Sequence, residues 1–354
     1  MSALFSPLQL RGVVFRNRVF VSPMCQYSAP DAVPADWHVV HYGARAVGGA
    51  GLVLLEATAV APEGRITPYE LGLWDDAQIA PLARLAALIR SAGCAAGIQL
   101  GHAGRKASCA RPWEGGEPLP RGNGGWEAVA PSPVPFAPGH PAPRALAKDE
   151  LPGIAEAFAA AARRAARAGF DVVEIHAAHG YLLHQFLSPL SNLRGDEYGG
   201  MPAARMRFPL EVTERVRAAW PDDRPLFVRI SATDWIPGGW DLEQSIVFAR
   251  ELKARGVDFV DTSSGGLAWD ARIPLGPGYQ VPFAAALRRE AGVPTGAVGL
   301  IAEARQAEEI VASGAADAVL IGRAALDDPH WALHAARVLG ADAPWPAQYL
   351  RAKR

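Results

Sequence analysis

Eight short apolar segments recur along the chain, and this recurrence limits the possible folds more than any other feature. They are continuous apolar runs, at residues 17–24, 51–60, 95–104, 171–180, 225–234, 258–266, 294–301 and 318–326. Such runs are typical of parallel strands that are buried on both faces, because the connecting helices cover the sheet. Most of them are followed by a loop and then by a helical pattern.

The helical patterns between these segments have recognisable ends. Residues 149–169 predict a helix with Asp149 at its N-cap and Gly169 just past its last turn. The next long helix repeats the scheme, with Asp241 as the cap and Gly256 at the end.

Eight strand–helix units with right-handed crossovers predict an α/β fold with a single domain over residues 1–354, a closed (β/α)8 TIM barrel. An open, doubly wound sheet is the competing fold. That fold often has a glycine-rich first turn after a strand, whereas the glycine cluster at 47–51 precedes its strand.

One connection is much longer than the others. Residues 105–148 follow the third strand and are rich in proline and glycine but poor in core residues. Loops of this length are usually functional lids or disordered segments. Because barrel enzymes keep their active sites on this face, we expect an excursion, with room for a short hairpin, that walls the site.

Composition argues against several classes of protein. The formal net charge is −1, and no basic run is interleaved with aromatic residues, so nothing favours a nucleic-acid partner. No apolar stretch approaches the roughly 18 residues of a membrane span, and the N-terminus lacks a signal-peptide pattern. Cys25, Cys94 and Cys109 show no CxxC spacing, which argues against disulfides and structural zinc. We therefore expect a cytoplasmic protein.

The carboxyl ends of the predicted strands carry many hydrogen-bond donors and few carboxylates, which suits a partly anionic ligand better than a metal ion. Gly299 and the pair Gly322-Arg323 follow the last two strands, where barrels commonly bind phosphate. Glycine lets backbone N–H groups approach closely, and arginine adds a bidentate contact. The alternative is a tight turn with a surface arginine.

Three polar rings, His176, His179 and Tyr181, crowd the end of the fourth apolar segment. If the chain turns helical after Ile175, the histidines become neighbours and could hold one oxygen atom together. Tyr181 could then act as a general acid. The alternative is one buried, satisfied histidine and one surface histidine. A zinc site would lack a third ligand in register.

Ordered motifs along nearly the whole chain resemble the Old Yellow Enzyme family of flavin-dependent ene-reductases. They are SPMCQYS, EATAV, IQLGHAGRKA, EIHAAHGYLLHQFLSPLSNLRGDEYGG, VRIS, DTSSGG and GRAAL. The cysteine in SPMC and the short C-terminal end resemble the thermophilic-like branch, which includes xenobiotic reductases.

The resemblance implies non-covalent FMN in the barrel mouth. The FMN phosphate would meet Gly299, Gly322 and Arg323, and Arg229 would lie near the N1–C2=O end of the ring. The remaining ring contacts would come from Ser22, Pro23, Met24, Cys25, Ala57 and Gln99. By itself, a lone cysteine such as Cys25 is more often a small buried hydrophobe.

The resemblance also implies a reaction. NADPH, or NADH, would reduce the flavin, and an α,β-unsaturated carbonyl compound would then receive hydride from flavin N5 at its β-carbon. His176 and His179 would bind the carbonyl oxygen, Tyr181 would protonate the α-carbon and Tyr27 would add a substrate contact. Quinones, nitro compounds and nitrate esters also suit such a pocket.

The C-terminal tail, residues 340–354, matters for assembly. In this branch an arginine of the tail reaches into the neighbouring subunit's site, and Arg351 matches it. The resemblance therefore implies a homodimer or homotetramer. The alternative is a frayed terminus.

Three other functions remain to be weighed. Dienoyl-CoA reductases and amine dehydrogenases share the barrel but add an iron–sulfur cluster, whereas this chain has no cysteine past Cys109. A flavin-free lyase or aldolase would need a Schiff-base lysine, and Lys106 is the one candidate near a strand end. A non-catalytic flavin-binding protein would leave the histidines and Tyr181 unused.

Trp269 lies where a bulky ring could narrow the pocket.

Overall fold

The structure is a computed structural model that describes residues 2–353. Eight parallel strands form a closed barrel, and each lies within one of the eight apolar segments, so the predicted fold is confirmed. Pairing of Phe20 with Leu52 closes the ring. In ring order the strands are β3 (Val19–Val21), β4 (Leu52–Ala59), β6 (Ala95–Gly101), β9 (Val172–Ala177), β10 (Leu226–Ser231), β11 (Phe259–Ser263), β12 (Thr295–Ala297) and β13 (Ala318–Ile321).

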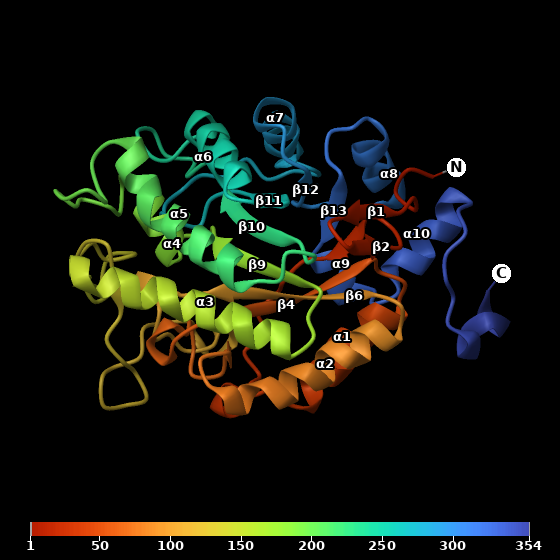
Figure 1. Ribbon diagram of the computed structural model, residues 1–354, viewed down its shortest axis with the longest axis horizontal. Helices are drawn as coiled ribbons and strands as arrows, with labels where there is room; N and C mark the ends of the chain where they lie inside the picture. Colours follow the sequence, from red (N-terminus) through yellow and green to blue (C-terminus); the bar gives the residue numbers. More distant parts are fainter. Residues whose placement is uncertain (1, 354) are drawn as a thin grey trace.

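Helices lie around the outside of these strands (Figure 1). The longer ones are α1 (Asp36–Val47), α2 (Ile79–Ser91), α3 (Leu151–Arg167), α5 (Pro202–Ala219), α6 (Leu242–Ala254), α7 (Val281–Ala291), α8 (Ala304–Ala312) and α10 (Trp331–Leu339). The short helices α4 (Leu182–Leu187) and α9 (Arg323–Asp327) follow β9 and β13 directly. Minor elements are β5 (Leu71–Gly72), η1 (Pro30–Ala32), η2 (Pro62–Gly64) and η3 (Asp76–Gln78).

The helix ends agree with one predicted cap and correct the other. The Asp241 carboxylate accepts a hydrogen bond from Gln244 N at 2.9 Å, as expected of an N-cap. The prediction that Asp149 caps α3 is wrong. A 3-10 turn, η6 (Lys148–Glu150), leads into α3, and the Glu150 carboxylate accepts from Ala147 N at 2.7 Å. The cap therefore moves back to the start of that turn.

The floor of the barrel is an aromatic core. The hairpin of β1 (Leu8–Leu10) and β2 (Val13–Phe15) covers the amino ends of the strands and packs with the inward side chains of the barrel. Phe15 lies 4.9 Å from Phe20 between ring centroids, and Phe227 lies 4.5 Å from Phe259. The polar side chains that point into the barrel therefore lie toward the carboxyl ends of the strands.

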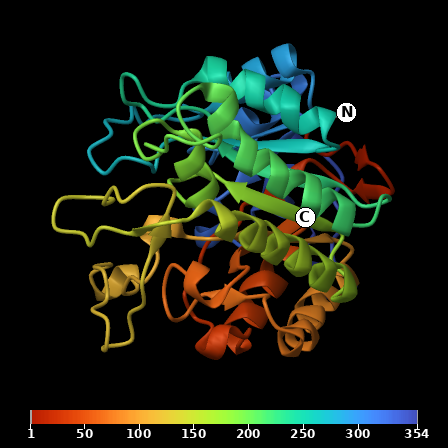
Figure 2. The same ribbon diagram turned by 60° about the vertical axis from the view of Figure 1, so that its left-hand side comes forward.

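The long excursion after β6 is partly ordered by hydrogen bonds. Leu119 N donates to Ser108 O at 2.7 Å, which forms a short hairpin. The buried Arg105 guanidinium donates to Val134 O, Pro135 O and Leu267 O, so it ties the excursion to the loop after β11. Figure 2 shows the excursion loops standing out from the barrel. Its elements are η4 (Gly104–Lys106), η5 (Pro112–Glu114), β7 (Val129–Ala130) and β8 (Arg144–Ala145).

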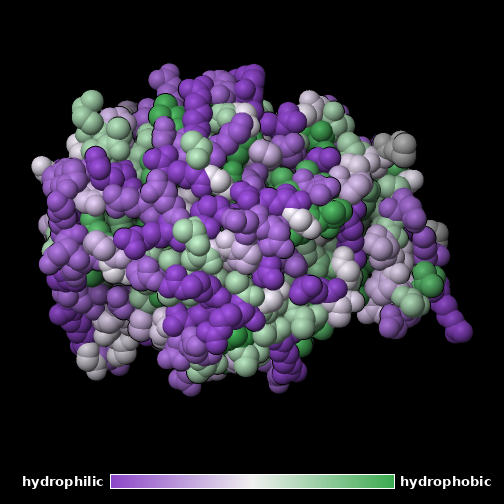
Figure 3. Space-filling model, in the orientation of Figure 1, coloured by the Kyte–Doolittle hydropathy of each residue, from purple (hydrophilic) through white to green (hydrophobic). Residues whose placement is uncertain are grey.

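The C-terminal segment stands off the body at the side opposite these loops (Figures 1 and 3). It ends in η7 (Ala347–Ala352), which is exposed and carries Arg351. Across residues 2–353, no helix has the length and apolar character needed to cross a membrane.

Candidate active site

A left-handed turn after β9 brings the two histidines together. The strand continues to Ala177, so the expected helical turn after Ile175 does not occur. Instead His179 adopts φ +58° and Gly180 φ +73°, which folds the ring of His179 back to 5.1 Å from that of His176. The centroid of the Tyr181 ring lies 4.9 Å from that of His176.

Contacts from other elements hold this strained turn. His179 N donates to Ser231 Oγ at 2.9 Å, and Lys106 Nζ donates to His179 O at 3.0 Å. The backbone of Gly266 packs so closely that an added Cβ would lie 2.7 Å from His179 Cα. A left-handed non-glycine residue costs about 1–3 kcal/mol and persists only where its surroundings fix it.

Both imidazoles are neutral at neutral pH, because burial first and the Arg229 charge second lower their pKa values well below 6.5. His176 Nδ1 accepts a hydrogen bond from Ala178 N at 3.2 Å, so the single proton lies on Nε2. His179 Nε2 lies 2.7 Å from Ser263 Oγ. Ser263 Oγ also lies 3.4 Å from Gln280 Oε1, but that oxygen accepts the shorter bond from Ser264 at 2.6 Å. Ser263 therefore donates to the nearer His179 Nε2, and Nδ1 carries the proton.

The tyrosine side of the mouth is a packed cluster. Tyr27, Cys25 and Tyr181 pack with Ile66 and other apolar residues. Burial, with Cys25 and Glu70, raises the pKa of Tyr181 well above 10, so its phenol stays protonated. Burial also raises the pKa of the Cys25 thiol. The Lys106 ammonium lies 5.2 Å from the Tyr181 ring centroid, and burial lowers its pKa to about 8.

A second group of polar side chains comes from β6, β9, β10 and β11. Gln99 Nε2 donates to Glu174 Oε1 at 2.8 Å, and Arg229 Nε lies 3.0 Å from Asp261 Oδ2. Arg229 pairs with both His176 and Asp261 in strand register, so this group lies beside the histidines.

The residues predicted to hold a phosphate lie after β12 and β13. Gly299 has φ +120°, and a Cβ there would lie 2.8 Å from Gln280 Nε2, so only glycine fits. At Gly322 the one atom within 4 Å of an added Cβ is Met24 Sδ at 3.8 Å, so Met24 and Gly322 are close neighbours. Arg323 begins α9 immediately afterwards.

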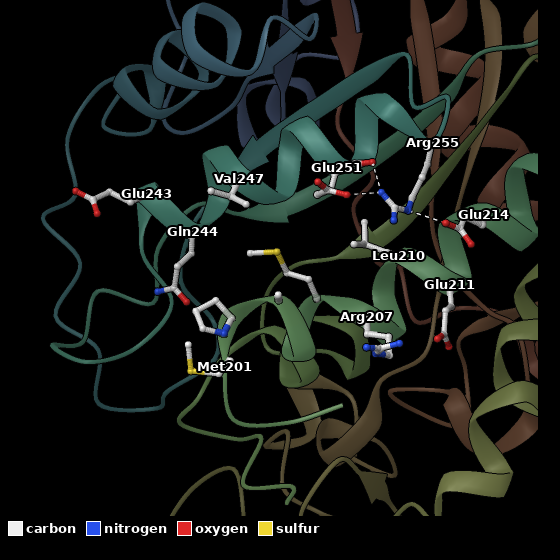
Figure 4. Close-up of a pocket in the computed structure, with 13 residues that line it drawn as sticks. Met201, Arg207, Leu210, Glu211, Glu214, Glu243, Gln244, Val247, Glu251 and Arg255 are labelled. Carbon is white, nitrogen blue, oxygen red and sulfur yellow. Dashed lines mark hydrogen bonds and ion pairs between the residues drawn. The ribbon is translucent and has the colours of Figure 1, made fainter. Parts of the chain in front are cut away.

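The structure has a cavity at the mouth of the barrel and a separate groove on its outer surface. A cavity of about 330 Å³ includes Tyr27, Lys106, Phe136 and Tyr181 in its lining, so the excursion walls the same space as the tyrosines. A groove of about 850 Å³ lies elsewhere, between α5 and α6 (Figure 4). Its Arg255 pairs with Glu214 and Glu251 at one end, and Met206, Leu210 and Val247 add apolar surface. The groove shares no lining residue with the cavity at the mouth.

Comparison with known proteins agrees with this geometry. The sequence profile of the NADH:flavin oxidoreductase / NADH oxidase family matches residues 3–341. The chain belongs to this family. An NADPH dehydrogenase of Geobacillus thermodenitrificans (strain NG80-2) is 48% identical over 355 residues, covering 100% of this chain and 99% of the relative.

Solved structures of this flavin oxidoreductase family superimpose on the whole barrel. Morphinone reductase has a TM-score of 0.80 at 32% identity, covering 97% of this chain and 91% of that one. The old yellow enzyme homologue from Zymomonas mobilis has a TM-score of 0.79 at 30% identity, covering 96% and 94%. The protein is therefore a flavin-dependent oxidoreductase.

The polar groups at the mouth of this oxidoreductase fit a flavin. Arg229 Nε is buried and, among residues 2–353, has no hydrogen-bond partner of good geometry. Gln99 uses its amide nitrogen on Glu174, which leaves its carbonyl oxygen for a ring N–H. The remaining predicted ring contacts, Ser22, Pro23, Met24, Cys25 and Ala57, lie at the carboxyl ends of β3 and β4.

Two predicted features lie apart from this mouth. Arg351 lies in η7, within the exposed C-terminal segment, and this segment stands away from the body of its own chain (Figure 1). The Trp269 side chain is 59% exposed, so most of the ring faces solvent instead of narrowing the pocket.

Sequence reasoning gave no role to several residues that hold the site. Ser231 and Ser263 fix His179, and Glu174 and Asp261 hold Gln99 and Arg229. The one available signal was four carboxyl or hydroxyl residues inside otherwise apolar strand segments, where burial is unfavourable unless the polar group is paired.

Proposed function

We propose that this protein is an FMN-dependent NAD(P)H oxidoreductase that reduces the activated C=C bond of α,β-unsaturated carbonyl compounds. The observation that carries the proposal is the pair of neutral imidazoles, 5.1 Å apart, with a protonated phenol beside them. The 48% identical NADPH dehydrogenase supports NADPH as the hydride donor, with NADH as the second option. Quinones, nitro compounds and nitrate esters belong to the wider substrate range that we propose.

The chain's own residues would bind and polarise the substrate. His176 Nε2–H and His179 Nδ1–H would donate to the carbonyl oxygen, where negative charge develops as the β-carbon is reduced. Because both donors are fixed before substrate arrives, no reorganisation is needed during the reaction. Tyr27 would contact the substrate from the other side of the mouth.

Bound FMN would supply the hydride, taken from NADPH and passed to the β-carbon. Arg229 would face the end of the ring where the resulting negative charge lies, and Gly299, Gly322 and Arg323 would hold the phosphate. Tyr181 would give its phenolic proton to the α-carbon and recover one from solvent, so that one hydride and one proton add across the double bond.

Anaerobic stopped-flow on the purified holoenzyme tests this proposal. NADPH should bleach the flavin, and 2-cyclohexenone should restore its colour. Replacing Tyr181→Phe should slow the recovery by about 10²–10⁴-fold, the usual contribution of a general acid, and leave the bleaching rate unchanged. A colourless protein that cannot be reconstituted with FMN would overturn the proposal, and an unchanged recovery rate would remove Tyr181 from it.

We also propose a homodimer or homotetramer, in a cytoplasmic setting, in which Arg351 enters the partner's site. The C-terminal segment exposes Tyr349 and Leu350, 43% and 54% accessible, and α1 exposes Trp37 and Val40. In the proposed assembly a partner subunit would cover these side chains. Light scattering on the holoenzyme would measure the oligomeric state directly.

A further inference from the structure

Four polar side chains lie inside the barrel between its aromatic floor and its mouth. They are Gln99 on β6, Glu174 on β9, Arg229 on β10 and Asp261 on β11, which are consecutive strands of the ring. Each is at most 5% exposed. Two carboxyl groups and a single guanidinium are therefore buried together, directly beside the residues that would contact the flavin ring.

The hydrogen bonding of the two carboxyl groups is incomplete. Glu174 Oε1 accepts from Gln99, but Glu174 Oε2 has no partner within residues 2–353. Asp261 Oδ2 forms an ion pair with Arg229 Nε at 3.0 Å whose angles fall short of a hydrogen bond, so both Asp261 oxygens lack one. Buried polar atoms are normally paired, so a full negative charge on these oxygens is unfavourable.

Charge balance favours a proton. With both carboxyl groups ionised, the cluster would carry a net negative charge away from water, which is strongly unfavourable. Burial, followed by the Asp261 charge, raises the pKa of Glu174 to about 8, against the opposing effect of Arg229. Burial raises the pKa of Asp261 to about 6. The two groups titrate together, as interacting carboxyl groups do.

No other strand supplies a competing charge. The sequences of β3, β12 and β13 contain no titratable residue. Glu56 on β4 faces α1, where it accepts from Tyr42 Oη at 2.9 Å. His176, the next inward side chain above Glu174, is neutral because burial lowers its pKa. Arg229 is therefore the one permanent charge that the barrel strands bring to the pair.

We propose that Glu174 and Asp261 are positioning residues beneath the flavin that bind one proton between them, and that, at a pH where the oxidised enzyme lacks this proton, the pair takes it up from solvent when the bound cofactor is reduced. This inference rests on the proposed function. Hydride transfer adds two electrons and one proton to the cofactor and leaves it with one additional negative charge near Arg229. That charge competes for the guanidinium, so one carboxylate of the pair becomes a carboxylic acid and the net charge of the buried region is unchanged.

The test is the reduction potential of FMN in the holoenzyme as a function of pH, measured by dye equilibration. Each proton taken up with two electrons adds about 30 mV per tenfold change in proton concentration. Glu174 is already protonated below about pH 8, so the wild-type curve should steepen by about 30 mV per pH unit above about pH 8. Glu174→Gln keeps the acceptor for Gln99 but cannot hold the proton, so its curve should lack this window, coincide with wild type near pH 6 and lie above it at pH 9.

Glu243→Gln is the matched control, because it removes one carboxylate from the exposed start of α6; its curve should follow wild type. Asp261→Asn serves if Glu174→Gln does not fold; it removes the charge that raises the pKa of Glu174, so its steep window should move to lower pH. A wild-type curve of constant slope from pH 6 to 9, or a steep window that stays at the wild-type pH in either variant, overturns the inference. If the potential has a constant slope but the yellow enzyme still reduces 2-cyclohexenone, the proposed function stands and only this inference fails. Failure to bind FMN would remove both the proposed function and this inference.

Discussion

Ser263→Ala tests how the orientation of His179 is set. The hydroxyl of Ser263 lies 2.7 Å from His179 Nε2, on β11, the strand two places from that of the histidine. If Ser263 donates this hydrogen bond, it places the ring proton on Nδ1, the atom that we propose binds the substrate oxygen. Removing the hydroxyl leaves the ring free to change tautomer and to rotate.

The size of the effect follows from this single contact. A neutral hydrogen bond contributes a net of about 1 kcal/mol, and 1.4 kcal/mol corresponds to a tenfold change in an equilibrium constant. The variant should therefore bind an oxygen ligand about fivefold more weakly. His176 should be unaffected, because its Nδ1 is fixed by Ala178 N of its own turn.

Phenol titration of the oxidised holoenzyme measures this effect through the absorption spectrum of the flavin, because a phenolate oxygen needs the same two donors. The FMN content of the variant should equal that of wild type. Thr262→Val is the control. Among residues 2–353 the Thr262 hydroxyl forms one hydrogen bond, to Val260 O of its own strand at 3.4 Å, so its removal should leave the phenol Kd unchanged. A Ser263→Ala variant that binds phenol as tightly as wild type would refute the assignment of the His179 tautomer.

Two further changes probe the turn and the tail. Gly266→Ala would place a Cβ 2.7 Å from His179 Cα at a φ of +85°, so we expect about 1–3 kcal/mol lower unfolding free energy by urea titration and weaker phenol binding. Gly276→Ala is the control, because nothing lies within 4 Å of a Cβ added there. Equal unfolding free energies of the two variants would contradict the close packing of Gly266 against His179. Arg351→Ala should raise the KM for 2-cyclohexenone about tenfold, the usual size of a lost charged hydrogen bond, with unchanged FMN content. The control is Arg305→Ala, at an exposed position on α8, which should leave the KM for 2-cyclohexenone unchanged. Identical kinetics of the two variants would exclude the tail from the site.

The barrel could be predicted because burial on both faces leaves a direct pattern in the sequence. Each of the eight apolar segments contains one strand, although the strands are shorter than the segments, as for Val19–Val21 within residues 17–24. Helix ends were less predictable. Asp149 and Glu150 are adjacent carboxylates, and only the three-dimensional course of the preceding turn decides which of them meets a backbone N–H.

The site was predictable in its residues but not in its geometry. His176, His179 and Tyr181 were found from their crowding, yet the left-handed φ of His179 has no local sequence signal. It depends on Ser231 and Gly266, which are distant in sequence and approach only in the closed barrel. A local pattern can indicate which side chains are costly to bury, but not which remote groups compensate for that cost.

Burial acts in opposite directions on the two kinds of ring in this mouth. It is the largest cause of the lowered pKa of His176 and His179, and also the largest cause of the raised pKa of Tyr181. Removing water disfavours the charged form of each group, and the charged form is the protonated one for histidine but the deprotonated one for tyrosine. The same exclusion of water thus leaves all three side chains neutral and each with one proton to donate. The walls of the mouth are therefore part of its chemistry, because a change that admitted water would restore the ordinary titration of all three rings together.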